Sequence, residues 1–221
     1  MSTDKLIASL PAGACRSRGE GIYSIMARTP LGDVSAEKLN IINSVVQDFH
    51  LPGVRVTGRQ RVQLLGIKEE DLQAVVERLG QVGEVCKYFV QACVGNTACR
   101  FGMQNSLAMG ADLEAFLNTT NLPAKLKSGV SGCSMSCAES YVRDVGMVGK
   151  KSGWTILFGG NAGKQVRKAD VLAESVSAEE GLKIIGKALD FYSENAKKKE
   201  RTARFVERVG FEAVRKAVFD R

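Results

Sequence analysis

Two close pairs of cysteines are the residues of this chain best suited to chemistry. Cys93 and Cys99 form the first pair, and Cys133 and Cys137 form the second, thirty-three residues further on. Thiolates are soft ligands for metals and iron–sulfur clusters, and a cluster of four irons needs four sulfurs from more than one segment. The two pairs therefore predict a bound inorganic centre.

Zinc binding and disulfide bonding fit these cysteines less well. Structural zinc pairs normally bracket two to four residues, whereas Cys93 and Cys99 bracket five. Disulfides need an oxidising compartment, and the N-terminal residues 1–7 lack the apolar core of a signal peptide. The alternative left open is that these are buried structural thiols. Cys15 and Cys86 have no partner at ligand spacing and are expected to be structural.

Composition limits the partners of the protein. The chain has 31 Lys and Arg against 24 Asp and Glu, and its net charge of +7 favours anionic partners. Aromatic content is only 6%, and no nucleic-acid-binding signature is present, so nucleic acid is not expected. Because no apolar run approaches twenty residues, no membrane span is expected and a cytoplasmic location is predicted.

The first part of the chain alternates between strand and helix patterns after an irregular lead-in at residues 1–21. The expected elements are a strand at 22–28, a helix after Ser35, a strand at 54–64, a helix at 72–79 and a further strand. This order predicts a ferredoxin-like α/β unit. On the strand at 54–64, Arg55, Arg59 and Arg61 have the same parity and are expected on one face.

The second part of the chain holds the cysteines within a mixed α/β pattern, so that the fold class is α+β. A helix is expected near 106–117, a strand at 124–130 that leads into Cys133, and strands at 142–148 and 154–158. The capping box at 177–180 predicts the start of another helix, and a charged helical tail is expected at 197–221. Residues 1–88 and 89–221 are the predicted domains.

The motifs in their order resemble the nitrite and sulfite reductases that carry sirohaem coupled to a 4Fe–4S cluster. The motifs are Thr57-Gly-Arg59-Gln60, the Cys93-x5-Cys99 pair, Pro123-x-Lys125-x-Lys127 leading into Ser131-Gly-Cys133-x3-Cys137, and Gly159-Gly160-Asn161. The similarity covers roughly residues 20–215 and is greatest to the small assimilatory-type sulfite reductases.

The resemblance implies an enzyme that reduces sulfite to sulfide with six electrons. It implies that Cys93, Cys99, Cys133 and Cys137 bind the cluster, with Cys137 also the axial ligand of the sirohaem iron. Nitrite reduction to ammonia by the same centre is the near alternative. An iron–sulfur electron carrier without haem is the alternative from another class.

The resemblance also implies roles for basic and glycine residues. Arg55 and Arg59 are expected at the sirohaem carboxylates or the substrate rim, and Arg61 at the cofactor. Lys125 and Lys127 are expected to hold substrate oxygens and deliver protons. Gly159, Gly160 and Asn161 are expected to present backbone N–H groups to a sirohaem carboxylate.

Departures from the larger family members bear on substrate and assembly, and one of them is a family arginine before the first cysteine pair that is absent here, with Phe89 in that region. Met26 stands where they carry a substrate-contacting arginine, and Arg28 lies two residues away. They also fuse two copies of this unit, so this chain either forms a homodimer or acts as one copy. No Rossmann or flavin fingerprint is present, which predicts a small electron-transfer protein as the donor.

Overall fold

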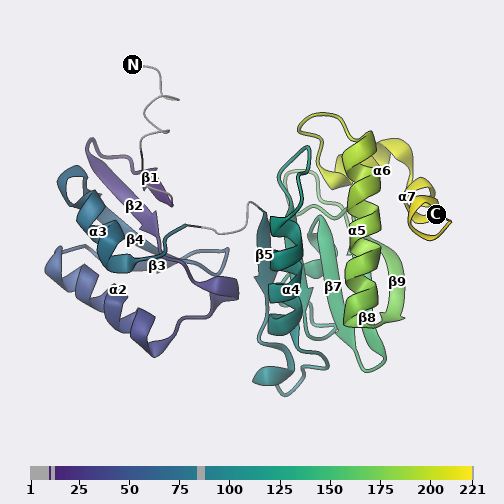
Figure 1. The fold of residues 1–221 in the computed structure, drawn as a ribbon, viewed down its shortest axis with the longest axis horizontal. Helices are drawn as coiled ribbons and strands as arrows, with labels where there is room; N and C mark the ends of the chain where they lie inside the picture. Colours follow the sequence, from purple (N-terminus) through teal and green to yellow (C-terminus); the bar gives the residue numbers. More distant parts are fainter. Residues whose placement is uncertain (1–9, 11–12, 84–87, 221) are drawn as a thin grey trace. The chain divides into compact units, whose positions relative to one another are not determined.

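The computed structural model describes residue 10 and residues 13–83 and 88–220, and the chain divides into two compact units, residues 1–85 and 86–221. Each unit consists of a β-sheet with helices against it (Figure 1). Cys86 lies outside the described residues. The α+β class predicted from the sequence is confirmed.

The first unit is a four-stranded antiparallel sheet with two helices. Its strands are β1 (Ala14–Arg16), β2 (Ile22–Met26), β3 (Val54–Val56) and β4 (Val62–Lys68), in the order β1-β2-β4-β3. Helices α2 (Ala36–Asp48) and α3 (Leu72–Leu79) pack their apolar residues against the sheet. The core combines side chains from strands and helices, among them Tyr23, Ile25, Leu64, Ile67, Val45, Val75 and Leu79.

The caps of these helices follow from the sequence. Ser35 is the N-cap of α2, and its side chain accepts the Lys38 N–H at 3.1 Å, which satisfies one of the first backbone donors of the helix. Gly80 ends α3 with a φ of 68°, a backbone angle that glycine adopts without steric cost. The helices expected after Ser35 and at 72–79 are therefore confirmed, and the strand expected at 22–28 is β2, which ends at Met26.

The expected single strand over residues 54–64 is wrong. Residues 57–61 form a turn, in which the Thr57 N–H donates to the Arg61 carbonyl at 2.8 Å and the Gln60 N–H donates to the Thr57 carbonyl at 3.0 Å. Gln60 has a φ of 56°, in the left-handed region that few non-glycine residues adopt. The segment is therefore a hairpin of β3 and β4. The lead-in is also more ordered than expected, because β1 pairs with β2.

The second unit is a mixed five-stranded sheet. Its strands are β5 (Phe89–Ala92), β6 (Lys127–Ser131), β7 (Val145–Lys150), β8 (Gly153–Phe158) and β9 (Asp170–Val176), in that order across the sheet. β5, β6 and β7 are parallel, and β8 and β9 are antiparallel to their neighbours. Helices α4 (Ser106–Asn118) and α5 (Ala178–Asn195) lie against the sheet (Figure 1).

Most predicted elements of the second unit are present with shifted ends. The helix at 106–117 and the helix after Ser177 are confirmed, and Ser177 accepts the Glu180 N–H at 3.1 Å. β6 and β7 begin about three residues later than expected, and β9 was not expected.

The C-terminal segment differs from the expected continuous helical tail. Residues 196–201 form no helix, and the chain then forms α6 (Thr202–Val209) and α7 (Phe211–Phe219), separated at Gly210 with a φ of 84°. This segment also contributes to the core, because Phe205, Val206, Val214 and Val218 are buried. Among the described residues, no helix has the length and apolar character needed to cross a membrane.

Candidate active site

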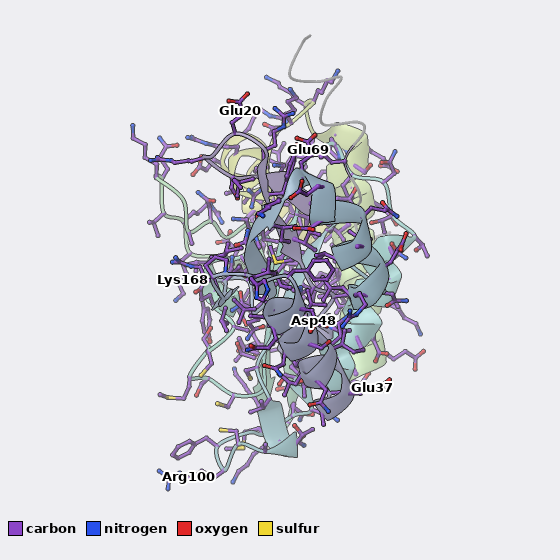
Figure 2. The ribbon with its side chains drawn as sticks, turned by 90° about the vertical axis from the view of Figure 1, so that its left-hand side faces the viewer. Glu20, Glu37, Asp48, Glu69, Arg100 and Lys168 are labelled. Atoms are coloured by element: carbon purple, nitrogen blue, oxygen red, sulfur yellow. The ribbon has the colours of Figure 1, made fainter. Side chains whose placement is uncertain are left out.

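The first cysteine pair follows strand β5. The Cys93 N–H donates to the Val130 carbonyl at 3.1 Å, which continues the pairing of β5 with β6. The chain then turns, and the Cys99 N–H donates to the Gly95 carbonyl at 2.9 Å. Arg100 lies at the end of this loop (Figure 2), with its guanidinium carbon 4.6 Å from the centroid of the Phe101 ring.

The second cysteine pair follows strand β6, the neighbour of β5. Because β5 and β6 are parallel, their carboxyl ends meet at one edge of the sheet, where open α/β sheets place their ligands. Both cysteine loops therefore begin at the same edge. This is the arrangement that a cluster with ligands from two segments requires.

Glycines hold the two cysteine loops in backbone contact. A Cβ on Gly132 would lie 2.6 Å from the Gly95 Cα atom, and a Cβ on Gly102 would lie 2.3 Å from the Gly95 carbonyl carbon. The N–H groups of Met103 and Gln104 also both donate to the Gly132 carbonyl, at 2.8 and 3.1 Å. Side chains at these glycines would force the loops apart. The glycines that lie beside the sulfurs in the sequence therefore bring the cysteine pairs together.

The four cysteines of the two pairs are free thiols. Cys93, Cys99 and Cys133 are half-buried, and Cys137 is exposed. The Cys93 Sγ atom accepts the Gly132 N–H at 3.2 Å and lies 3.3 Å from the Ser106 Oγ atom. Hydrogen bonds of this kind orient metal-binding ligands in proteins.

Thiolates from two separate loops are the ligand set of a four-iron cluster, which binds a different thiolate at each iron. Within the described ranges, no three His, Cys, Asp or Glu side chains are close enough to share one metal ion. Exposed large apolar side chains also gather in these loops: Val94, Phe101, Met103 and Met135. Such a surface suits a large cofactor that would cover it.

The chain after Cys137 crosses one face of the second sheet. Gly129 of β6 and Gly146 of β7 are paired in register. A Cβ on Gly129 would lie 2.3 Å from the Ala138 carbonyl oxygen, and a Cβ on Gly146 would lie 2.1 Å from the Ser140 carbonyl oxygen. Only glycine at both positions leaves room for this crossing.

The face that is crossed lies opposite helix α5. Met147 follows Gly146 and therefore points to the other side of the sheet, where its Cε atom lies 3.2 Å from a Cβ built on Gly181 of α5. Serine side chains fix the crossing. The Ser131 Oγ atom accepts the Ala138 N–H at 3.1 Å and hydrogen-bonds the Ser140 Oγ atom at 2.8 Å. These bonds hold the backbone directly after Cys137.

Lys127 lies on the same face of the sheet. It is two residues before Gly129 in β6, so its side chain leaves the sheet on the side that the chain after Cys137 crosses. Lys125 precedes the strand and is exposed, whereas Leu126 between the two lysines is buried. Strand alternation therefore places Lys127, whereas Lys125 lies in the exposed segment before the strand.

A cleft of about 700 Å³ opens beside Lys125. The cationic side chains that line it are Lys125, Lys199 and Arg201. The other lining residues are Tyr88, Leu122, Pro123 and Ala124. Lys199 and Arg201 come from the segment before α6, more than seventy residues away in the sequence. Arg201 is paired with Asp144, so Lys125 and Lys199 supply the positive charge that suits a small anion or a carboxylate.

Arg143, Asp144 and Arg201 were not singled out in the sequence. Arg143 is buried and donates to the Gln91 side chain at 2.7 Å and to Glu139 at 2.6 Å. Asp144 is buried and pairs with Arg201. The only signal was an adjacent Arg–Asp pair before an apolar strand, which does not reveal partners more than fifty residues away.

The glycine motif at 159–161 does not present its N–H groups as expected. The Gly159 N–H donates to the Asp144 carbonyl and the Gly160 N–H to the Arg143 carbonyl, each at 2.9 Å. The Asn161 N–H donates to the Arg167 carbonyl, also at 2.9 Å. All three donors are therefore bonded within the chain. The motif instead packs against the backbone at Arg143, where a Cβ on Gly160 would lie 2.4 Å from the carbonyl oxygen.

The three arginines expected on one strand face separate into different environments. Arg55 is exposed on β3 opposite Gln63, and Arg59 is exposed in the turn. Arg61 is fully buried, and its guanidinium donates to the Arg59 and Gln60 carbonyls at 3.4 Å each. Arg61 thus shapes the turn that carries Arg59. All three belong to the first unit.

Two ionisable groups of the C-terminal region are perturbed. Hydrogen bonding from Arg208 is the main cause that lowers the pKa of Glu200 to about 2. Burial, followed by the negative charge of Asp144, raises the pKa of Tyr192 well above its usual range. Glu200 is therefore an anion at neutral pH, and Tyr192 is a neutral hydrogen-bond donor to the Glu200 carbonyl.

Family models match nearly the whole described chain. Residues 86–221 match the nitrite and sulphite reductase 4Fe-4S domain, and residues 16–82 match the nitrite/sulfite reductase ferredoxin-like half domain. These matches agree with the resemblance drawn from the motifs.

Curated relatives include both sulfite and nitrite reductases. The chain is 42% identical to the assimilatory-type sulfite reductase of Nitratidesulfovibrio vulgaris, over 94% of this chain and 97% of that protein. It is 39% identical to a nitrite reductase (NAD(P)H) of Bacillus subtilis, over 91% of this chain but only 26% of that protein. The chain thus spans nearly all of the first relative and about a quarter of the second.

Solved structures share the fold. The Mycobacterium tuberculosis NirA protein superposes with a TM-score of 0.75 at 20% identity, over 92% of this chain and 41% of that one. Dissimilatory sulfite reductase I superposes with a TM-score of 0.74 at 15% identity, over 89% of this chain and 69% of that one. From the matched domains and the first relative, we conclude that the chain belongs to the nitrite and sulphite reductase family of oxidoreductases.

Proposed function

We propose that this protein reduces sulfite to sulfide at a sirohaem coupled to a 4Fe–4S cluster. The observation that carries the proposal is the joining of two Cys-bearing loops at one sheet edge, with Lys127 on the face that the chain after Cys137 crosses. The 42% identity to an assimilatory-type sulfite reductase along almost its full length supports sulfite as the substrate.

Four cysteines would hold the cluster: Cys93, Cys99, Cys133 and Cys137. Cys137 is the exposed member of this set, which suits a thiolate that also binds the sirohaem iron. When bound, the coupled centre supplies single-electron storage and transfer to a substrate that takes up six electrons. The serine and glycine contacts after Cys137 would hold its sulfur in one position.

Basic residues would bind the anions. Arg55 and Arg59 carry planar guanidinium groups that bind carboxylates with two parallel hydrogen bonds, so we assign them to the sirohaem carboxylates or the substrate rim. Arg61 would act through the turn that carries Arg59. The glycine motif, Gly159, Gly160 and Asn161, would allow close approach of the cofactor.

Lys125 and Lys127 would hold sulfite oxygens and deliver protons. Hydrogen sulfite takes up six electrons and six protons to give hydrogen sulfide anion and three water molecules. Each S–O bond that breaks needs a proton at the departing oxygen, and a lysine ammonium is a mobile donor for this purpose.

Electrons would come from a small electron-transfer protein that docks with the chain in the cytoplasm. The net charge of +7 supports an acidic protein as this donor, because opposite charges speed the encounter of two proteins. Two chains would associate as a homodimer if the reaction needs two copies of the unit, and light scattering of the holoprotein tests this association.

Turnover of sulfite and nitrite by the purified protein with a reduced dye tests the proposal. We expect sulfite to give the larger kcat/KM, with sulfide as the product. Nitrite is the second candidate, because several nitrite reductases match most of this chain. Sulfite turnover at background, with rapid nitrite turnover, would replace the first proposal by the second.

A further inference from the structure

Asp144 is a buried carboxylate at the start of β7, and its side chain is 1% exposed. Its Oδ1 atom accepts the Arg201 Nε–H at 2.9 Å and the Thr202 hydroxyl at 2.6 Å. Its Oδ2 atom accepts a second Arg201 N–H and the Lys127 N–H, the latter at 2.8 Å. A buried carboxylate is costly unless its oxygens are bonded, and here both are.

The backbone of Asp144 binds Lys127 as well. The Asp144 N–H donates to the Lys127 carbonyl at 2.9 Å, while the Lys127 N–H donates to the Asp144 side chain. Both backbone groups of Lys127 are therefore bonded to one residue. This fixes the point at which the lysine side chain leaves the sheet.

The segment before α6 holds the other end of the lysine loop. The Lys199 N–H donates to the Pro123 carbonyl at 3.0 Å. Lys199 has a φ of 64°, a backbone angle that persists in a non-glycine residue only where its surroundings fix it. Residues 123–127 are thus held at one end by Lys199 and at the other by Asp144 with Arg201.

We propose that Asp144 and Arg201 are positioning residues for Lys127, so that the C-terminal segment sets the geometry of proton delivery. This inference rests on the proposed function. A buried pair of opposite charges suits the task, because it orients the lysine backbone without adding net charge to the cleft beside Lys125.

The structure predicts an unusual kinetic effect of Asp144→Asn. Both carboxylate oxygens accept from Arg201, so the amide puts a donor against Arg201 in either orientation. It thereby breaks the paired contact that holds the side chain against the Lys127 N–H. The Arg201 charge is then no longer neutralised beside the cleft. We expect kcat for sulfite to fall on the order of 10- to 100-fold, while KM stays unchanged or decreases.

The experiment is a double-mutant cycle of Asp144→Asn with Lys127→Gln in the holoprotein, together with amide hydrogen exchange of the peptide that contains Lys127. We expect faster exchange of the Lys127 amide in Asp144→Asn, and a double variant no slower than Lys127→Gln alone. Multiplicative losses of kcat, or unchanged exchange at Lys127, would overturn the proposal.

Two further variants control for general destabilisation. Val214→Ala removes buried volume from α7 without touching Asp144, and it should lower stability while keeping the sulfite kcat/KM and the Lys127 exchange. Arg201→Lys keeps the charge but loses the paired contact with Asp144, so it should show the Asp144→Asn effects in weaker form. It also serves if Asp144→Asn does not fold. Wild-type protein that reduces no sulfite would refute the proposed function, while amide exchange would still decide whether Asp144 holds Lys127.

Discussion

Lys127 is held by Asp144 through its backbone and carries the side chain that we propose as a proton donor. Its backbone is bonded on both sides to Asp144, and its side chain lies on the sheet face that the chain after Cys137 crosses. A proton donor must be held at a fixed distance from the oxygen that it protonates, so a rigid backbone at this point favours the reaction.

Replacing Lys127 by alanine should lower turnover without loss of cofactor. Removal of a general acid typically costs 10²- to 10⁴-fold in rate, so we expect sulfite turnover to fall by roughly that factor. The visible spectrum and iron content should match the wild type, because the cysteines are untouched.

The control is Lys151→Ala, which removes an exposed lysine from the turn between β7 and β8. It should keep the wild-type rate. Equal rates for Lys127→Ala and Lys151→Ala would remove Lys127 from the mechanism.

Glu200 should contribute to stability in a pH-dependent way. Its pKa is lowered from 4.5 to about 2 in the folded protein, chiefly by the Arg208 hydrogen bonds, so its ionised form favours folding. This contribution is complete above pH 4.5 and is lost as the pH falls toward 2. In Glu200→Gln it should be absent.

Urea unfolding between neutral pH and the acid limit measures this effect. We expect the stability difference between wild type and Glu200→Gln to shrink as the pH falls below 4.5. Glu212→Gln changes an exposed carboxylate of α7, and its stability should vary with pH in parallel with that of the wild type. A Glu200→Gln profile that also runs parallel would show that the ion pair is not formed in solution.

Single residues could be predicted from the sequence where the members of a group lie only a few positions apart. The cysteine pairs and the two alternating lysines were visible because their members lie within a few positions of one another. Asp144 and Arg201 were not, because their interaction joins residues 57 positions apart. The N–H groups of Gly159 and Gly160 were assigned wrongly for a similar reason, since their acceptors, the Asp144 and Arg143 carbonyls, lie on the far side of β7 and β8 in the sequence.

Among the strands and helices, two glycines paired across neighbouring strands shape the site. Gly129 and Gly146 lie opposite each other on β6 and β7, and they open the sheet surface to the backbone after Cys137. Glycines in strands normally weaken a sheet, so their presence at matched positions indicates close approach of another backbone.

Gly146→Ala should therefore displace the Cys137 loop. The new Cβ would lie 2.1 Å from the Ser140 carbonyl oxygen, and overpacking of this kind costs about 1–3 kcal/mol of stability. We expect a lower melting temperature and less bound cofactor per chain, measured by iron content and visible absorbance.

Gly186→Ala is the matched control. A Cβ at Gly186 in α5 would meet its nearest atom, in the Phe116 ring, at 3.4 Å, an ordinary contact, and alanine favours helix. This variant should keep its cofactor and its melting temperature or raise the latter. Full cofactor content in Gly146→Ala would contradict the role given to the crossing.

The hairpin of β3 and β4 was predicted from the sequence as one continuous strand at 54–64. Val54 pairs with Leu64 and Val56 with Val62, so even-numbered residues share a face on both sides of the turn. A single strand would give the same alternation. Periodicity therefore could not separate the two structures, and the turn at 57–61 was marked only by Gly58.

The whole molecule consists of two compact units, residues 1–85 and 86–221. The family and both domain types were predictable because their motifs occur in a fixed order, and the matched family models confirm them. The C-terminal segment was least predictable. A charged helical tail was expected there, whereas the segment contributes both core residues and the partners of Asp144.

The visible absorption spectrum of the purified holoprotein tests the central claim most directly. A sirohaem coupled to a cluster predicts a Soret band with a long-wavelength α-band. Cys137→Ser should lose or shift these haem bands, because it removes the thiolate that we propose as a ligand of the haem iron. A broad iron–sulfur shoulder without haem bands would contradict the sirohaem assignment and would leave an electron carrier in its place.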